Sequence, residues 1–192
     1  MSEPKVHPLI GQRWSPRAFD PTRPVSRGKV VALIEAARWA PSSYNTQPWR
    51  FLVFDTDVPD ALEKARACLS PGNERARKAP VLILGVAQVT NPARGTENRY
   101  ARHDLGLATE NFLLQAVAEG LVAHPMAGFD KSKCREFFRI PDGYEPWTMI
   151  ALGYFEGSAE EAELERSRRT RLPLRRIAFH GKWDEPLPGE SA

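Results

Sequence analysis

The sequence predicts an α+β fold in which helices cover both faces of a central mixed sheet of about four strands. Residues 80–89, PVLILGVAQV, form a nearly unbroken apolar run, which is typical of a strand buried on both faces. Residues 97–119 carry apolar side chains almost all the way round a helix, so this helix needs neighbours on several sides. Shorter strand and helix patterns alternate along the rest of the chain.

The remaining elements are predicted from apolar periodicity together with a cap or a breaker. They are a helix at 26–39, a strand at 50–54, a helix from residue 59, a strand at 121–124, a helix at 130–138, a strand at 147–155, a helix at 158–166 and a strand at 175–179. Ser26, Asp130 and the Ser158–Glu161 capping box supply N-caps, and Gly120 ends the long helix.

Length and composition predict one globular domain over residues 1–192, with a frayed tail at about 185–192. With 42% hydrophobic and 27% charged residues, the chain does not resemble a disordered protein. No apolar run approaches the roughly 20 residues of a membrane span, and no signal-peptide pattern opens the chain, so we expect a cytoplasmic protein. Cys68 and Cys134 lack metal or redox spacing and are interpreted as reduced structural thiols.

Positive charge gathers near the C-terminus, where eleven residues hold six arginines and no acid. These arginines are 166, 168, 169, 171, 175 and 176. Such a segment indicates an anionic partner or extensive solvation. The formal net charge of +3 is too small to indicate nucleic acid, and the cluster lacks the interleaved aromatic residues of a nucleic-acid module.

Several kinds of catalytic site are absent from the sequence. No two glycines stand two residues apart, which excludes a G-x-G-x-x-G or Walker loop, and the histidines show no zinc spacing. A serine triad of Ser43, His124 and Asp104 has no G-x-S-x-G elbow to support it. We expect no metal site and no side chain that acts as a classical acid–base catalyst.

Two short stretches carry unusual sets of polar side chains. Arg13, Ser15 and Arg17 alternate in RWSPRAF, so an extended backbone places them on one face as a phosphate-binding set. Residues 40–51, APSSYNTQPWRF, connect a helix to a strand but hold more polar side chains than a turn requires.

These stretches resemble the nitroreductase family of FMN-dependent oxidoreductases. Further matches follow in the family's order: DLGLA and LLQAVAEGL in the long helix, HPMAGFD, IALGYF and RTRLPL. The resemblance covers about residues 9–183. It implies the nitroreductase-like α+β fold, a homodimer with FMN sites at the interface, and exchange of the C-terminal strand 175–179 between the two chains.

The resemblance also implies residue roles. Arg13 and Ser15 would meet the phosphate and ribityl chain of FMN, Arg17 the pyrimidine edge, and Arg169 and Arg171 would complete the phosphate site. The partner's loop would contact the flavin through Pro41, Ser42, Ser43 and Asn45, supported by Gln47. The segment along the isoalloxazine ring comprises Pro125, Met126, Ala127 and Gly128, with the Ala127 amide near N5. Asn73 is assigned to the pyrimidine end, where GNERARKAP also offers Arg75, Arg77 and Lys78, and Ala127 stands where many members carry an acid.

The implied activity is an NAD(P)H-dependent, ping-pong transfer of hydride through N5 of a tightly bound FMN. The acceptor would be small, of the nitroaromatic or quinone type. The alternative is an FMN-binding storage or sensor protein without turnover. Neither reading involves nucleic acid or a membrane.

Overall fold

The computed structural model describes residues 6–91 and 95–187 of the chain. It divides into two compact units, one reaching to Gly157 and the other beginning at Ser158, and each unit is described by itself. The predicted frayed tail lies outside the described residues from residue 188 on. Among the described residues, no helix is both long enough and apolar enough to cross a membrane.

A four-stranded sheet forms the centre of the first unit. Its strands are β1 (Trp49–Phe54), β2 (Val81–Gln88), β3 (Val122–Met126) and β4 (Tyr144–Gly153), in the spatial order β1-β2-β4-β3. Every pairing between them is antiparallel, so the prediction of a mixed sheet is wrong for these four strands. Each strand of the described unit runs opposite to its spatial neighbour, which leaves no parallel pair within it.

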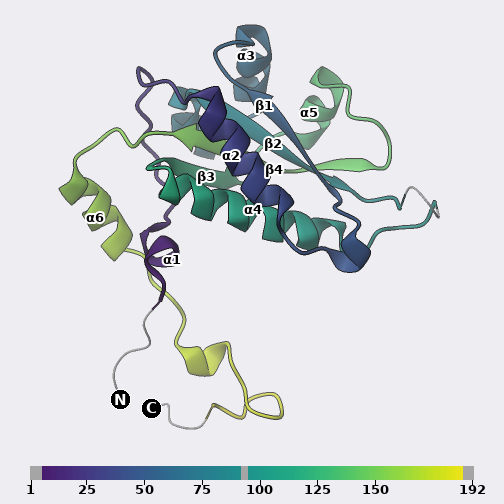
Figure 1. Cartoon of the computed structure of the whole chain (residues 1–192), viewed down its shortest axis with the longest axis vertical. Helices are drawn as coiled ribbons and strands as arrows, with labels where there is room; N and C mark the ends of the chain where they lie inside the picture. The colour runs from purple at the N-terminus through teal and green to yellow at the C-terminus, as the bar shows by residue number, and fades with distance from the viewer. Residues whose placement is uncertain (1–5, 92–94, 188–192) are drawn as a thin grey trace. The chain divides into compact units, whose positions relative to one another are not determined.

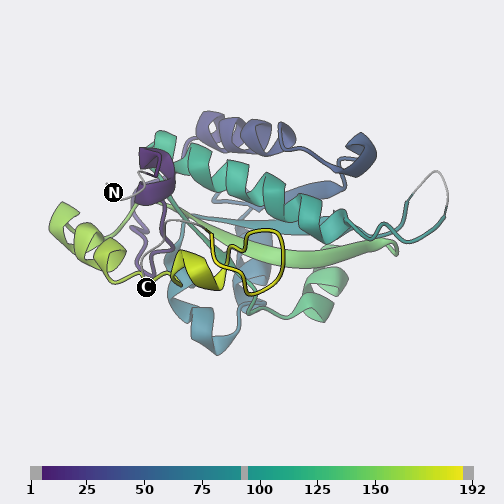
Figure 2. The ribbon, with the colours of Figure 1, turned by 90° about the horizontal axis from the view of Figure 1, so that it is seen from below.

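Helices cover both faces of this sheet (Figures 1 and 2). One face carries α2 (Arg27–Arg38) and α4 (Ala101–Ala118), and the other carries α3 (Pro59–Ala67) and α5 (Lys131–Phe137). The shorter helical segments of the unit are α1 (Pro8–Gln12) and the 3-10 helices η1 (Ser43–Asn45) and η2 (Pro71–Lys78). The α+β architecture is confirmed.

Strand β2 is buried on both faces, as its apolar run predicts. Leu82 and Leu84 pack toward α3 and α5, while Val81 and Ile83 pack toward α2 and α4. A register shift after Gly85 lets β4 begin at Tyr144, three residues before the predicted start. Pro146 forms the first pair beyond this shift, with Val86. Proline has no N–H to donate, and a strand accepts it where the regular ladder is interrupted.

The N-caps form as predicted. The Ser26 and Asp130 side chains accept hydrogen bonds from the amides of Lys29 and Lys133. Helix α4 begins at Ala101, not at residue 97, because Glu97 pairs with Thr90 in an isolated β-bridge. Gly120, with φ of +69°, follows the end of α4.

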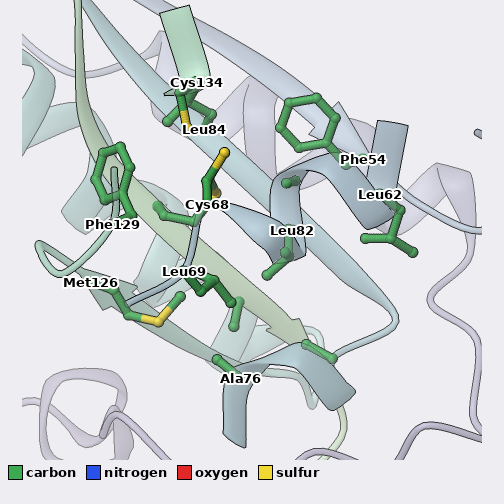
Figure 3. Close-up of a cluster of buried hydrophobic side chains, with 14 of the residues drawn as sticks. Phe54, Leu62, Cys68, Leu69, Ala76, Leu82, Leu84, Met126, Phe129 and Cys134 are labelled. Atoms are coloured by element: carbon green, nitrogen blue, oxygen red, sulfur yellow. The ribbon is translucent and has the colours of Figure 1, made fainter. Parts of the chain in front are cut away.

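Cys68 and Cys134 are free and buried, and they lie beside one another between α3 and α5 (Figure 3). Their thiols hydrogen-bond to each other, and Cys68 Sγ also donates to the carbonyl of Lys64 at 3.2 Å. Burial raises the pKa of both thiols. The structural role is as predicted, whereas the pairing of two cysteines 66 positions apart has no local signal in the sequence.

The second unit holds α6 (Ala159–Ser167) and the 3-10 helix η3 (Leu174–Arg176). The Ser158–Glu161 capping box starts α6, as predicted. The predicted strand at 175–179 is not formed in this chain, since η3 occupies its start and only Phe179 makes a β-bridge, to Pro186. A strand needs a neighbour for its backbone groups, and the described part of this unit offers only that short pairing.

Candidate functional site

The arm, residues 13–19, follows α1 in an extended conformation without regular strand pairing. Pro16 and Phe19 are buried, and the Trp14 ring packs edge-on against Phe155 with ring centroids 5.8 Å apart. Ser15 and Arg17 are exposed on either side of Pro16. The alternation expected from RWSPRAF is therefore present, and the polar residues of the arm face away from the core.

The backbone after β3 is held at the carbonyl of Gly128. This oxygen accepts three hydrogen bonds, from the Ser70 amide at 3.1 Å, Ser70 Oγ at 2.7 Å and Asn73 Nδ2 at 2.8 Å. A Cβ at residue 128 would lie 2.6 Å from Ser70 Oγ and 2.8 Å from Asn73 Nδ2. Glycine is thus required by the close approach of the two polar side chains. The exposed Ala127 directly precedes this fixed point.

A cavity of about 580 Å³ opens between the arm, η2 and β3. Its lining comprises Arg17, Pro71, Gly72, Asn73, Glu74, Arg75, Ala76, Lys78 and His124. Three of these residues are cations, and Glu74 is the one acid in the lining. Lys78 Nζ lies 3.6 Å from Glu156 Oε2, so the positive excess of the cavity comes from Arg17 and Arg75. Among the described residues, Arg17 and Arg75 form no ion pair, which leaves both guanidinium groups available to an anion.

His124 joins the cavity to the arm. Its Nδ1 lies 2.9 Å from the carbonyl oxygen of Pro16, the residue before Arg17. Burial, with a smaller contribution from the Arg17 charge, lowers the pKa of His124 below its ordinary value, against the raising effect of the Pro16 hydrogen bond. Burial therefore favours the neutral form of the ring.

The loop at residues 41–47 is held in an unusual backbone conformation. Tyr44, Asn45 and Gln47 all have positive φ, between 46° and 54°, which residues with a Cβ adopt at some cost. The Gln47 amide donates to Ser42 Oγ at 3.0 Å, and the Gln47 side chain donates to the Asn45 carbonyl at 3.3 Å. Both of these hydrogen bonds lie within the loop, while the Tyr44 side chain is 97% exposed.

Asp104 anchors this loop to α4. Its carboxylate is buried in the first turn of the helix, where Oδ2 accepts from the Ser43 amide at 2.9 Å. His103 Nδ1 lies 3.0 Å from Asp104 Oδ1. A carboxylate in the first turn also interacts favourably with the helix dipole. Asp104 therefore fixes the position of the loop and, in this geometry, is not part of a serine triad.

The loop and the arm lie at opposite ends of α4. Ser43 contacts the first turn of the helix, whereas α1 and the arm after it lie by its last turns (Figures 1 and 2). Helix α4 has 18 residues and is therefore about 27 Å long. One chain thus carries two separate groups of predicted site residues.

The fold and these two groups can be compared with known proteins. A family model described as "Nitroreductase family" matches residues 10–154, which is most of the chain. The chain belongs to the nitroreductase family. The match spans the arm, the loop, η2 and the segment after β3.

Individual members of the nitroreductase family agree with this assignment. The chain is 26% identical to the "Oxygen-insensitive NAD(P)H nitroreductase" of Salmonella typhimurium, over 85% of this chain and 93% of that protein. It is 29% identical to an "NADH dehydrogenase" of Thermus thermophilus, over 81% and 86%. A crystal structure described as "the oxidoreductase containing FMN" superposes with a TM-score of 0.84 and 31% identity, covering 95% of each chain.

The structure brings part of the predicted nitroreductase site together. Arg17 and Asn73 line one cavity, and Asn73 contacts Gly128 in the segment 125–128. Pro41, Ser42, Ser43, Asn45 and Gln47 gather at the other end of α4. Arg169 and Arg171 belong to the second unit, where Arg169 Nε donates to the Arg166 carbonyl at 3.0 Å.

Sequence reasoning missed several residues of this region. His124 and Asp104 were considered for a serine triad, Ser70 received no role, and Arg75 and Lys78 were offered beside Asn73 in GNERARKAP without an assignment. Their partners are distant in sequence, and their roles become visible only when β3, η2 and the arm meet. The cluster of cations after Asn73 was the one signal that could have indicated the electropositive wall.

The residues present fit the flavin that the nitroreductase family implies. FMN is an anion with a planar, hydrogen-bonding ring, and the cavity offers cations, an amide side chain and a fixed backbone segment at one place. The donor set is therefore suitable for the flavin end of FMN, with Arg13 and Ser15 adjacent along the arm.

Proposed function

We propose that this chain is an FMN-dependent oxidoreductase that passes hydride from NAD(P)H, through N5 of the flavin, to a small nitroaromatic or quinone-type acceptor. Family membership supports the reaction class. The observation that carries the proposal is the electropositive cavity beside the fixed segment 125–128, because it offers a planar anionic cofactor both charge and orientation. Localisation in the cytoplasm and one domain over 1–192 remain predictions.

We assign the FMN phosphate to Arg13 and Ser15, whose positions in the arm match the family pattern. Arg17 and Asn73 would meet the pyrimidine end, and the backbone of Pro125, Met126, Ala127 and Gly128 would lie along the ring. Arg169 and Arg171 are assigned to the phosphate on the family pattern alone. Bidentate guanidinium groups suit phosphate oxygens because their donors are planar and parallel.

Bound FMN supplies the redox chemistry, since it accepts hydride from a nicotinamide and returns it to an acceptor. The chain's own residues bind and orient it. A cation at the pyrimidine end, Arg17 in this assignment, would stabilise negative charge there, and the backbone amide of Ala127 would donate a hydrogen bond to the flavin ring without titrating. One open pocket used in turn by donor and acceptor gives ping-pong kinetics.

We propose a homodimer with two FMN sites because the predicted residues of one site cannot meet within one chain. The arm and the loop are separated by the length of α4, about 27 Å for its 18 residues. A partner's loop, residues 41–47, would complete the site at the arm of the first chain. Its exposed Tyr44 and its constrained backbone fit a contact surface.

We further propose that residues 175–179 of each chain extend the partner's sheet beside β1. Strand β1 is apolar and, among the described strands, pairs only with β2, whereas the other edge strand, β3, contains Pro125. A groove of about 320 Å³ with the apolar residues Val30, Val31, Ile34 and Val53 adjoins this edge. Strand β1 begins just after the loop at residues 41–47, and residues 175–179 begin just after Arg171. The loop and Arg171 are both assigned to the flavin, so the two segments would start near one FMN site and run in the same direction. Their pairing would therefore be parallel.

The test is an anaerobic absorbance titration of the purified protein reconstituted with FMN, first with NADH and then with NADPH. We expect bleaching near the flavin maximum with at least one donor. A bound flavin that stays oxidised with both donors would instead identify the non-catalytic storage or sensor protein. Absence of any bound flavin would contradict the proposal as a whole.

The phosphate assignment is tested with Arg13→Ala and Arg171→Ala, and with Arg168→Ala as the matched control on the exposed end of α6. Each of the first two should weaken FMN binding about tenfold or more, because a hydrogen bond to a charged group contributes about 1.5 to 3 kcal/mol. Arg168→Ala should bind FMN as the unaltered protein does. Unchanged binding in both test variants would refute the assignment.

A further inference from the structure

His124 has a single tautomer available in its neutral form. The carbonyl oxygen of Pro16, 2.9 Å from Nδ1, can only accept a hydrogen bond, so Nδ1 carries the proton. The other ring nitrogen, Nε2, then holds a lone pair and is the atom that gains a proton when the ring is charged. Because His124 lines the cavity, its charge acts on whatever fills that cavity.

The charged groups around His124 are predominantly cationic. Arg17 comes from the arm, and Glu74, Arg75 and Lys78 come from η2, where Lys78 is paired with Glu156 at 3.6 Å. On β4, the residue opposite His124 is Ala151, within an apolar stretch that has no titratable side chain. Protonation of His124 in the empty cavity therefore adds a further positive charge to a set that already has a positive excess.

This balance changes when the occupant of the cavity gains negative charge. Hydride transfer delivers two electrons and one proton, so a flavin that receives hydride gains one negative charge unless a second proton arrives. An added anion beside Arg17 and His124 offsets the repulsion between these two groups and stabilises imidazolium.

We propose that His124 takes up this second proton, at Nε2 and from water, when the flavin bound in the cavity is reduced. The inference rests on the proposed function. It makes His124 a positioning residue and not a catalytic residue, because His124 acts through its charge and through its contact with the Pro16 carbonyl, next to Arg17. The electrons and one proton go to the flavin, and the second proton becomes part of a neutralising ion pair.

Proton uptake by His124 affects the flavin's reduction potential only within one pH range. Above the pKa of His124 in the reduced protein, the ring is neutral in both redox states, and below its pKa in the oxidised protein it is charged in both. Between these two values, reduction brings one additional proton. The flavin's reduction potential there should fall with rising pH by about 30 mV more per pH unit, the value for one proton per two electrons.

The experiment measures the reduction potential of the FMN-loaded protein spectroscopically at a series of pH values. His124→Asn keeps an amide that can donate to the Pro16 carbonyl but cannot titrate. His7→Asn is the matched control, since His7 is exposed and caps α1 through a side-chain acceptor that asparagine also has. We expect the additional slope in the unaltered protein and in His7→Asn, and its loss in His124→Asn.

A second measurement uses the unaltered protein, so it does not depend on whether the His124→Asn variant folds. The chain has four histidines, and NMR titration of their ring protons in the oxidised and reduced holoprotein should show one pKa that rises on reduction. Equal slopes in all three proteins, or four histidine pKa values unchanged by reduction, overturn the inference while leaving FMN binding intact. Failure to bind FMN at all overturns the proposed function as well, so the two failures are distinguishable.

Discussion

Gly128 shows how one residue without a side chain organises its neighbours. Its carbonyl accepts from Ser70 and from Asn73, and the space a Cβ would need is already filled by these same two side chains. The contacts connect η2 to the segment after β3, two parts of the chain more than 50 positions apart. The cavity wall therefore depends on a backbone contact that only glycine permits.

Gly128→Ala should lower the free energy of unfolding by about 1 to 3 kcal/mol, the usual cost of overpacking. The added methyl group must displace Ser70 Oγ or Asn73 Nδ2, and either movement breaks a hydrogen bond. Chemical denaturation at one protein concentration measures the change. Gly72→Ala is the control, because a Cβ at residue 72 meets nothing within 4 Å. Equal stability of the two variants would contradict this account.

At the scale of elements, the connection between α2 and β1 has an ordered structure of its own. Three non-glycine residues with positive φ lie within four positions, and the buried carboxylate of Asp104 accepts from the backbone at Ser43. The helix thus determines where the loop begins, and Ser42 and Gln47 determine how it returns to the strand. The loop is positioned by α4 more than by its own sequence.

Asp104→Ala should free this loop. The Ser43 amide loses its acceptor in a partly buried position, which costs about 1 to 3 kcal/mol of the free energy of unfolding. Hydrogen–deuterium exchange should show a faster amide at Ser43. Glu110→Ala, at an exposed position of the same helix, should change neither quantity. A protected Ser43 amide in Asp104→Ala would show that the loop holds its conformation without this contact.

Elements with a local signal were predictable, and those that depend on distant partners were not. The caps at Ser26, Asp130 and Ser158 were correct because a cap and its helix adjoin in sequence. The early start of β4 was missed because Pro146 argues against a strand unless the irregularity at Trp147, which has no partner in β2, is known. The arm was identifiable by residue type and Asn73 by the resemblance to the family, whereas His124 needed the fold to place it beside Pro16.

At the scale of the whole molecule, apolar side chains are exposed where a partner chain would cover them. Within the second unit, Leu172, Ile177 and Trp183 are 64%, 60% and 78% exposed. Helix α4, predicted to have neighbours on several sides, leaves Leu107 and Leu114 only half-buried in the single chain. Both sets of apolar side chains are available to the proposed homodimer as contact surface.

Ile177→Asp should weaken the proposed homodimer, because it places a charge in a segment expected to cover the partner's β1. Light scattering after size exclusion should show monomer at concentrations where the unaltered protein is dimeric, together with weaker FMN retention. Leu164→Asp is the control, since Leu164 is exposed on α6, outside that segment. A dimer that persists in Ile177→Asp would contradict the proposed exchange.

The separation of the arm from the loop along α4 has a genetic consequence for such a dimer. A chain with a defective loop and a chain with a defective arm would each be inactive alone, because every site of each homodimer is damaged once. Mixed dimers of the two chains would contain one site with both defects and one with neither. Two null alleles of this single gene would therefore complement each other, with one working site in each mixed dimer.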